Sequence, residues 1–256
     1  MSETTLQPEE QITPEIEGLF NAGVHFAYKK TRRHPKMRPF IAGVKSNVEI
    51  FHLDKVEECI VAACAYIGHL GETKKVVMWV GTKPAADTTI TAIGNELKQP
   101  YVSRRWLGGT LTNFRTMKTR ISHLESLESQ RDKGEFDKYR KHERMRLNDE
   151  IEKMNQSFGS VRSLSRMPDA VVIVDINEES TALSESRKTG VPIVAIINSD
   201  CDPSGVAYPI PANDNAPRSV EHILNRLKTA YLDGLKRAPI PASAPEGGTP
   251  AVPVGQ

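Results

Sequence analysis

The stretch RRWLGGTLTNF (residues 104–114) separates two kinds of sequence. Before it, short apolar runs alternate with helical patterns. After it, a helical period carries charges of both signs and contains almost no Pro or Gly. The pair Gly108-Gly109 allows a sharp turn, Trp106 can anchor that turn in a core, and Thr110 or Thr112 is expected to cap the helix that follows. The stretch therefore predicts a joint between two structural units.

Outside residues 109–164, strand-like runs alternate with helix-like patterns. This alternation predicts an α/β fold with a parallel sheet covered by helices on both faces. Because proline is confined to edge strands, Pro209 and Pro211 place the last strand at an edge. The predicted strands are residues 75–81, a short run from Tyr101, 169–175, 192–197 and 208–211, and the predicted helices are 84–97, 178–188 and 216–236.

The N-terminal part of this domain is expected to add a helix, a loop and a strand pair before the sheet begins. Residues 23–40 have no sustained period and predict an extended loop, which we call the basic loop. A hairpin is expected around residues 45–47. The predicted elements are a helix at 14–22, strands at 40–44 and 48–53, and a helix capped by Asp54 that ends near Leu70 before Gly71.

Residues 109–164 predict a pair of helices that fold back on each other. Apolar residues recur at spacings of three and four in two separate runs, which is typical of coiled-coil seams. Residues 133–135 break the pattern, so an antiparallel coiled-coil hairpin is expected. The predicted domains are a flexible acidic N-terminus (1–13), an α/β sheet domain (14–108 and 165–237), the coiled-coil hairpin insert (109–164) and a disordered Pro-rich tail (238–256) with five Pro and three Gly.

Composition limits the class of protein. The 256 residues are 38% hydrophobic, 26% charged and 6% aromatic, and no apolar run reaches the length that spans a membrane. Five Glu and no Lys or Arg precede Gly18, unlike a targeting leader, so a cytoplasmic location is expected. The three cysteines lack the spacing of a zinc site and are expected to be reduced and structural.

Charge is strongly segregated although the net charge is only +2. Seven Lys or Arg and no acid lie between Gly18 and Val48, and aromatic residues lie among them. Cations with interleaved rings suit a phosphate backbone and exposed bases, although a solvated basic loop is an alternative interpretation. The predicted RNA-binding residues are Lys29, Lys30, Arg32, Arg33, His34, Lys36 and Arg38 in the basic loop, with Arg104, Arg105, Arg115, Lys118 and Arg120 at the joint.

Other patterns favour catalysis or binding of a small molecule only weakly. The run Gly81-Thr82-Lys83 follows a strand, but a complete phosphate-binding signature is missing. Asp175, Asp200 and Asp202 follow predicted strands, and Asp175 and Asp200 are interpreted as helix and turn caps. No catalytic residue, metal ligand or cofactor is expected. Two alternatives stay open: an α/β enzyme acting on a phosphorylated small molecule, and a coiled-coil adaptor protein.

Several segments together resemble one family, the bacterial small-subunit ribosomal protein number two. The resemblance covers about residues 14–236, in order and at similar spacing. It departs from the usual pattern at Ala27-Tyr28 and at Arg33-His34. The matching segments are Gly23-Val24-His25-Phe26, Arg32-Arg33, Pro35-Lys36-Met37, residues 80–83, 100–102, 105–109, 111–114, 167–170 and 201–203, Tyr208-Pro209-Ile210-Pro211 and Asn213-Asp214.

The resemblance implies a flavodoxin-like sheet with an inserted coiled-coil hairpin and a structural, non-catalytic role in the small ribosomal subunit. Its implied partners are small-subunit ribosomal RNA, neighbouring small-subunit proteins and, in many bacteria, the large mRNA-binding ribosomal protein. It implies a position near the mRNA path. A homo-oligomer and a membrane partner are not expected.

Overall fold

A computed structural model describes residues 13–238 and places a five-stranded parallel sheet at the centre, in the order β5-β4-β6-β7-β8. This confirms the predicted α/β class. The predictions for residues 1–13 and 238–256 lie outside the described residues, apart from Thr13 and Ala238. The strands are β4 (Val77–Val80), β5 (Tyr101–Val102), β6 (Ala170–Val174), β7 (Ile193–Ile197) and β8 (Tyr208–Pro211).

Burial explains the strand sequences. Every residue of β4, β6 and β7 is buried, which accounts for their continuous apolar runs. β8 lies at the edge, as its two prolines predict. The sheet therefore has its most apolar strands in the middle.

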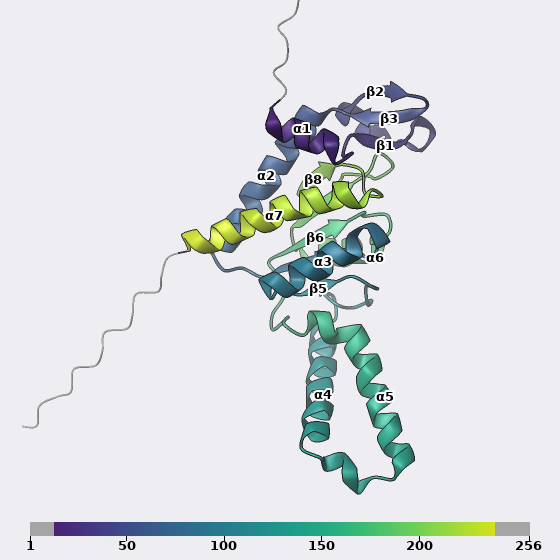
Figure 1. The fold of residues 1–256 in the computed structure, drawn as a ribbon, viewed down its shortest axis with the longest axis vertical. Coiled ribbons are helices and arrows are strands. Elements are labelled where there is room, and N and C mark those ends of the chain that lie inside the picture. Colours follow the sequence, from purple (N-terminus) through teal and green to yellow (C-terminus); the bar gives the residue numbers. More distant parts are fainter. Residues whose placement is uncertain (1–12, 239–256) are drawn as a thin grey trace, which may run out of the picture.

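Helices cover both faces of the sheet (Figure 1). α7 packs against α2 and α3, so these three helices share one face. The right-handed crossover that joins β6 to β7 places α6 on the opposite face. The predicted inner face of the last helix is confirmed, because Val220, Ile223, Leu224, Leu227 and Tyr231 are buried. The helices are α2 (Leu53–Glu72), α3 (Pro84–Leu97), α6 (Ser180–Thr189) and α7 (Pro217–Arg237).

The segment before the parallel sheet forms a second, antiparallel sheet in the order β1-β3-β2. The predicted hairpin is confirmed, with Ser46 and Asn47 at positive φ in its turn. The prediction of an extended basic loop is wrong in two places. Residues 26–29 are a strand paired with β3 and not a loop, and the two 3-10 turns that follow are not extended. The elements are α1 (Pro14–Asn21), β1 (Phe26–Lys29), η1 (Lys30–Arg32), η2 (Pro35–Phe40), β2 (Ile41–Lys45) and β3 (Val48–Phe51).

The predicted boundaries of α2 are wrong at both ends. The N-cap is His52 rather than Asp54, and the helix continues past Gly71 to Glu72. Gly71 lies inside the helix because α7 passes so close that a Cβ atom there would overlap the carbonyl oxygen of Tyr231. The glycine thus permits a close helix crossing instead of ending a helix.

The insert forms two helices, α4 (Phe114–Asp132) and α5 (Lys141–Phe158), joined by η3 (Glu135–Lys138) and followed by η4 (Gly159–Val161). Gly134, at φ +73°, marks the predicted break. Met117, Ile121, Leu124 and Leu127 of α4 are buried, whereas Leu147 and Met154 of α5 are only partly buried. A two-helix hairpin is present; its coiled-coil packing stays a prediction, as does the division of the chain into domains.

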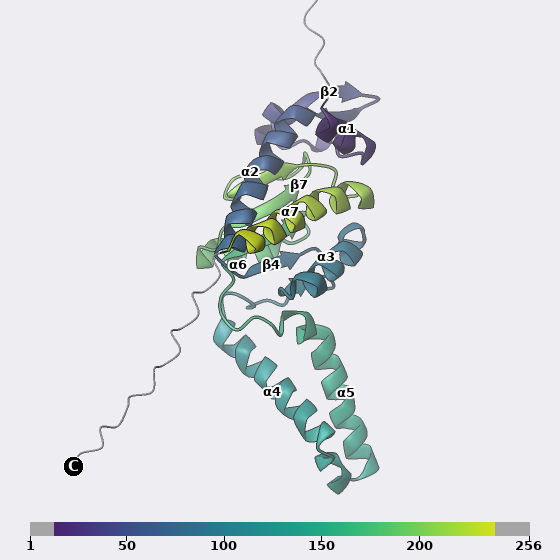
Figure 2. The same ribbon diagram turned by 60° about the vertical axis from the view of Figure 1, so that its left-hand side comes forward.

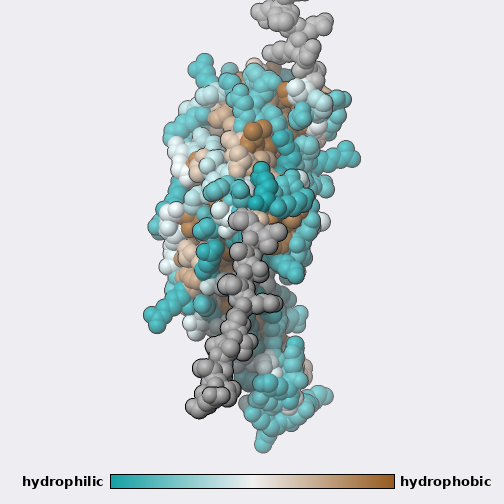
Figure 3. All heavy atoms as spheres, turned by 90° about the vertical axis from the view of Figure 1, so that its left-hand side faces the viewer, coloured by the Kyte–Doolittle hydropathy of each residue, from teal (hydrophilic) through white to brown (hydrophobic). Residues whose placement is uncertain are grey.

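The helical hairpin and the small antiparallel sheet lie at opposite ends of the molecule in both ribbon views (Figures 1 and 2). The face seen in Figure 3 is largely hydrophilic, and hydrophilic residues dominate at the end of the hairpin. Among residues 13–238, no helix combines the length and the apolar character that a membrane span requires.

Candidate nucleic-acid interface

The basic loop is held on the carboxyl end of β7. The amide nitrogen of His34 donates to the carbonyl oxygen of Ser199 at 2.8 Å, and that of Tyr28 donates to Ser199 Oγ at 3.2 Å. Met37, which belongs to the loop, is fully buried. These contacts fix the backbone of the loop against the end of β7.

The cations of the loop fall into two groups. Lys29, Lys30 and Arg38 are exposed, and none of them pairs with an acid within residues 13–238. The guanidinium carbon of Arg32 lies 5.4 Å from the centre of the Tyr28 ring, an arrangement that orients the side chain without neutralising its charge. These four side chains keep their full charge for an outside partner.

Arg33 and His34 are instead half-buried and help to hold the loop. Arg33 Nη1 lies 2.9 Å from Oε1 of Glu49, whose side chain is fully buried. His34 Nδ1 accepts from the amide of Lys36 at 3.4 Å. Glu49 comes directly after the acid-free stretch in the sequence, so folding brings an acid to a loop that has none of its own.

Lys36 also has an acidic neighbour. Its Nζ lies 3.2 Å from Oδ1 of Asp202, which follows β7, and it donates to Ser204 Oγ at 2.5 Å. The amide of Ser204 donates the hydrogen bond with the largest effect on Asp202, and the Ser204 hydroxyl donates a second. Together with the charge of Lys36, these bonds lower the pKa of Asp202 to about 2. Lys36 therefore joins the loop to the turn after β7.

The joint is built around a carboxylate from α6. Glu185 Oε1 accepts from Trp106 Nε1 at 3.1 Å and from the Gly109 amide at 2.7 Å. Its Oε2 accepts from the Leu111 amide at 3.0 Å and from the amide and hydroxyl of Thr112, both at 3.1 Å. Burial disfavours the charged form, but hydrogen bonds from the joint outweigh burial and lower the pKa of Glu185.

The predicted cap of α4 is wrong. The N-cap is Asn113, which makes no side-chain capping bond. Thr110 donates its hydroxyl to the carbonyl oxygen of Leu107 at 2.6 Å, and Thr112 donates to Glu185 at 3.1 Å, so neither threonine is available to cap. The turn itself is as predicted, with Gly109 at φ +89°.

The two groups of predicted RNA-binding residues lie at the same edge of the parallel sheet, where its strands end. Arg104 and Arg105 follow the carboxyl end of β5, the basic loop rests on that of β7, and β4 and β6 lie between. At about 4.8 Å per strand, roughly 14 Å separates the two strands. All five cations at the joint are exposed: Arg104, Arg105, Arg115, Lys118 and Arg120.

Lys83 occupies the middle of this edge, but an ion-pair cluster engages it. Its Nζ lies 2.6 Å from Oδ2 of Asp175 and 2.6 Å from Oδ2 of Asp214. Burial alone would lower the pKa of Lys83, but the bonds to both carboxylates raise it. The ammonium is thus already neutralised, which argues against the phosphate site of the enzyme alternative. The described residues contain no group of three His, Cys, Asp or Glu side chains suited to a metal ion.

The sequence interpretation missed Glu49, Glu185 and the partners of Lys83 as organising residues. Glu185 lies in a polar helix among Ser, Arg and Lys residues, where a carboxylate normally faces water. Its role depends on contacts with residues more than 70 positions away, so no local signal identifies it.

Comparison with known proteins supplies an independent result. The family described as Ribosomal protein S2 matches residues 19–234. A protein named "Small ribosomal subunit protein uS2" from Roseiflexus sp. (strain RS-1) is 40% identical over 222 residues, covering 87% of this chain and 85% of the relative. Proteins of the same name from Roseiflexus castenholzii and Coprothermobacter proteolyticus are 39% and 37% identical, covering 87% and 86% of this chain and 84% and 82% of the relatives.

Proposed function

The chain belongs to the ribosomal protein S2 family, and we propose from this premise that its exposed cations bind ribosomal RNA in the small ribosomal subunit. Its role is that of a structural component of the small subunit and not of an enzyme, which replaces both alternatives considered from the sequence. Within a bacterial cell this role places the chain in the cytoplasm, in the small subunit.

The proposed RNA contacts are the cations that have no acidic partner among the described residues. Lys29, Lys30, Arg32 and Arg38 of the basic loop belong to this set, as do the exposed arginines and lysine of the joint, Arg104, Arg105, Arg115, Lys118 and Arg120. Such side chains neutralise phosphates and release counterions, so RNA affinity should fall steeply with salt. Arg33, His34 and Lys36 act mainly by holding the loop, because Glu49, the amide of Lys36 and Asp202 engage them.

Protein partners are proposed more broadly. Neighbouring small-subunit proteins are expected to contact the domain and the helical hairpin. Docking of the large mRNA-binding ribosomal protein near the mRNA path follows from the family resemblance. We further propose that the sheet domain (14–108 and 165–237) and the hairpin (109–164) act as separate contact units.

One observation carries the proposal: a chain with a family match over residues 19–234 has two groups of exposed cations at one edge of its sheet. The direct test is sedimentation of a gentle cell lysate, with detection of the chain across the gradient. At high magnesium it should travel with intact ribosomes, and at low magnesium with free small subunits. A chain that stays at the top of both gradients in growing cells would overturn the ribosomal role.

A further inference from the structure

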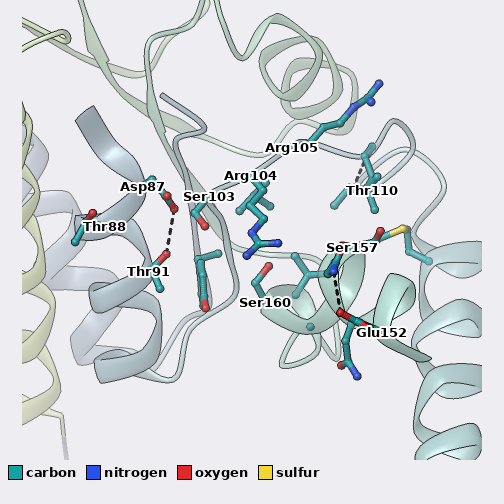
Figure 4. Close-up of a pocket in the computed structure, with 18 residues that line it drawn as sticks. Asp87, Thr88, Thr91, Ser103, Arg104, Arg105, Thr110, Glu152, Ser157 and Ser160 are labelled. Carbon is teal, nitrogen blue, oxygen red and sulfur yellow. Dashed lines mark hydrogen bonds between the residues drawn. The ribbon is translucent and has the colours of Figure 1, made fainter. Parts of the chain in front are cut away.

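A cleft of about 720 Å³ opens where the helical hairpin meets the sheet domain (Figure 4). One wall consists of the first turns of α3 and of residues 101–105, which comprise β5 and the three residues after it. The other consists of the last turns of α5 and of η4, and Met117 from α4 also contributes to the lining. A cavity of this volume lies within the usual range for a small ligand or a single nucleotide.

The two arginines before the joint face in different directions. Arg104 extends into the cleft toward Ser160, whereas Arg105, which also contributes to the lining, extends away from Ser160. No hydrogen bond joins Arg104 to the other lining residues, and no acid within residues 13–238 pairs with it. A guanidinium directed into a cleft without a partner presents its planar set of donors to whatever enters.

Hydroxyl groups line the same cleft. The Asn155 amide also lines it but is already bonded to Glu128 and Arg162, which leaves the hydroxyls of Thr88, Ser103, Ser157 and Ser160. They can donate to phosphate oxygens and can both donate to and accept from a sugar or a base edge. The lining therefore suits a ligand with one anionic group and several neutral polar groups.

Two acids limit the charge that the cleft accepts. Asp87 and Glu152 also line it; Asp87 accepts from Thr91 Oγ1 at 3.5 Å, and Glu152 accepts from Gln156 Nε2 at 3.5 Å. Arg104 and Arg105 both belong to the lining, so its two cations are balanced by the two carboxylates. Such a cleft has no excess positive charge for a polyphosphate, whereas Arg104 alone can pair with the single negative charge of a phosphodiester.

We propose that the cleft receives one nucleotide of an RNA strand, with Arg104 on its phosphate and the hydroxyl groups on its sugar and base. This inference rests on the proposed function, because it assumes that the chain binds ribosomal RNA. The walls belong to the sheet domain on one side and to the hairpin on the other. A nucleotide between them therefore fixes the angle at which the hairpin leaves the domain.

The test compares Arg104→Ala with Arg105→Ala in the full chain, using small-subunit ribosomal RNA transcribed in vitro. Removal of the Arg104 guanidinium should weaken RNA binding about tenfold, as expected for a charge-assisted hydrogen bond to phosphate. Arg105 is also a proposed RNA contact, but its exposed charge is screened by solvent and salt, so its removal should weaken binding by only about twofold. Lys188→Ala, at an exposed residue in the last turn of α6, provides a variant outside both cation groups.

A second measurement reports the hairpin angle. Spin labels are attached to cysteines introduced at the exposed residues Asn95 of α3 and Met145 of α5, in a Cys59→Ser, Cys64→Ser background. Added RNA should narrow the distance distribution between the labels in the parent protein and in Arg105→Ala, but not in Arg104→Ala. Circular dichroism of each variant checks that the fold is retained.

The possible failures are distinguishable. If the parent protein binds no RNA, the proposed function itself fails. If the parent binds but Arg104→Ala and Arg105→Ala weaken binding equally and both retain the narrowing, the cleft is not a nucleotide site and the proposed function stands. Adenosine or uridine monophosphate could instead bind in an Arg104-dependent manner while Arg104→Ala leaves RNA affinity unchanged. In that case the cleft binds a free nucleotide, and the assignment to RNA is overturned.

Discussion

The carboxylate of Glu185 accepts five hydrogen bonds from residues 106–112, including three from backbone amides. These amides belong to the turn around Gly109 and precede α4, so water or another acceptor would otherwise have to satisfy them. A charged acceptor is better suited to this role than a neutral one, because hydrogen bonds to ions are stronger. One residue of α6 thereby holds the turn that leads into α4.

Glu185→Gln should destabilise the chain at neutral pH by about 2–3 kcal/mol, because the amide group of glutamine would face N–H donors and the charge would be lost. The pKa of Glu185 is lowered by folding, so its contribution to stability is present above the unfolded value of about 4.3 and is lost as pH falls through the folded pKa. Urea unfolding at several pH values measures the difference. The gap between parent and variant should narrow on acidification.

Glu178→Gln is the matched control, since Glu178 is exposed and lies just before α6 begins. It should change the free energy of unfolding by less than about 0.5 kcal/mol, as surface substitutions usually do. A Glu185→Gln variant as stable as this control at pH 7 would show that the carboxylate does not hold the joint.

Between elements, the closest approach is the crossing of α2 and α7. A Cβ atom on Gly234 of α7 would overlap the carbonyl oxygen of Gly68, and one on Gly71 of α2 would overlap that of Tyr231. Both obstacles are backbone atoms, which cannot rotate away as a flexible side chain can. The helix pair covers one face of the sheet, so its spacing affects the packing of the domain as a whole.

Gly234→Ala should therefore destabilise the fold by about 2 kcal/mol or more, although alanine is the better helix former, because the two helices must separate. Gly18→Ala in α1 is the control: its Cβ would lie 3.4 Å from Cε1 of the His222 side chain, close to an ordinary contact. That change should be neutral or slightly stabilising. Thermal unfolding of both variants measures the difference, and equal melting temperatures would contradict the role assigned to the crossing.

The elements that sequence predicted well are those whose signals are local. Continuous apolar runs identified β4, β6 and β7, and proline correctly placed β8 at an edge. The errors lie where a distant partner decides the structure. β1 forms because residues 26–29 pair with β3, and Gly71 stays helical because α7 passes over it. Glu185 likewise acts through a segment that only the folded chain brings near.

For the candidate interface, the sequence identified the cations but not which of them are paired with an acid in the folded chain. Charge density alone could not separate Arg33, which is held by a buried carboxylate, from Arg32 beside it, which faces solvent. Nor could it place the joint and the basic loop at one edge of the sheet. That placement depends on strand order, and strand order is a property of the whole molecule.

At the scale of the whole molecule, the exposed cations along the carboxyl edge of the sheet predict how RNA affinity depends on salt. The combined change Lys30→Ala and Arg38→Ala removes two exposed cations that have no acidic partner among the described residues. It should weaken binding to small-subunit ribosomal RNA and reduce the slope of log affinity against log salt by about one for each phosphate that is no longer neutralised. Stability should be unchanged, because neither side chain is buried.

Lys188→Ala is the control for this change in charge. Helices that follow parallel strands run back across the sheet, so Lys188, in the last turn of α6, lies near the opposite, amino edge. Its removal lowers the net charge but should leave the salt slope unaltered. If Lys188→Ala reduces the slope as much per charge as the loop variant does, RNA responds to net charge alone, and the carboxyl edge of the sheet is not the interface.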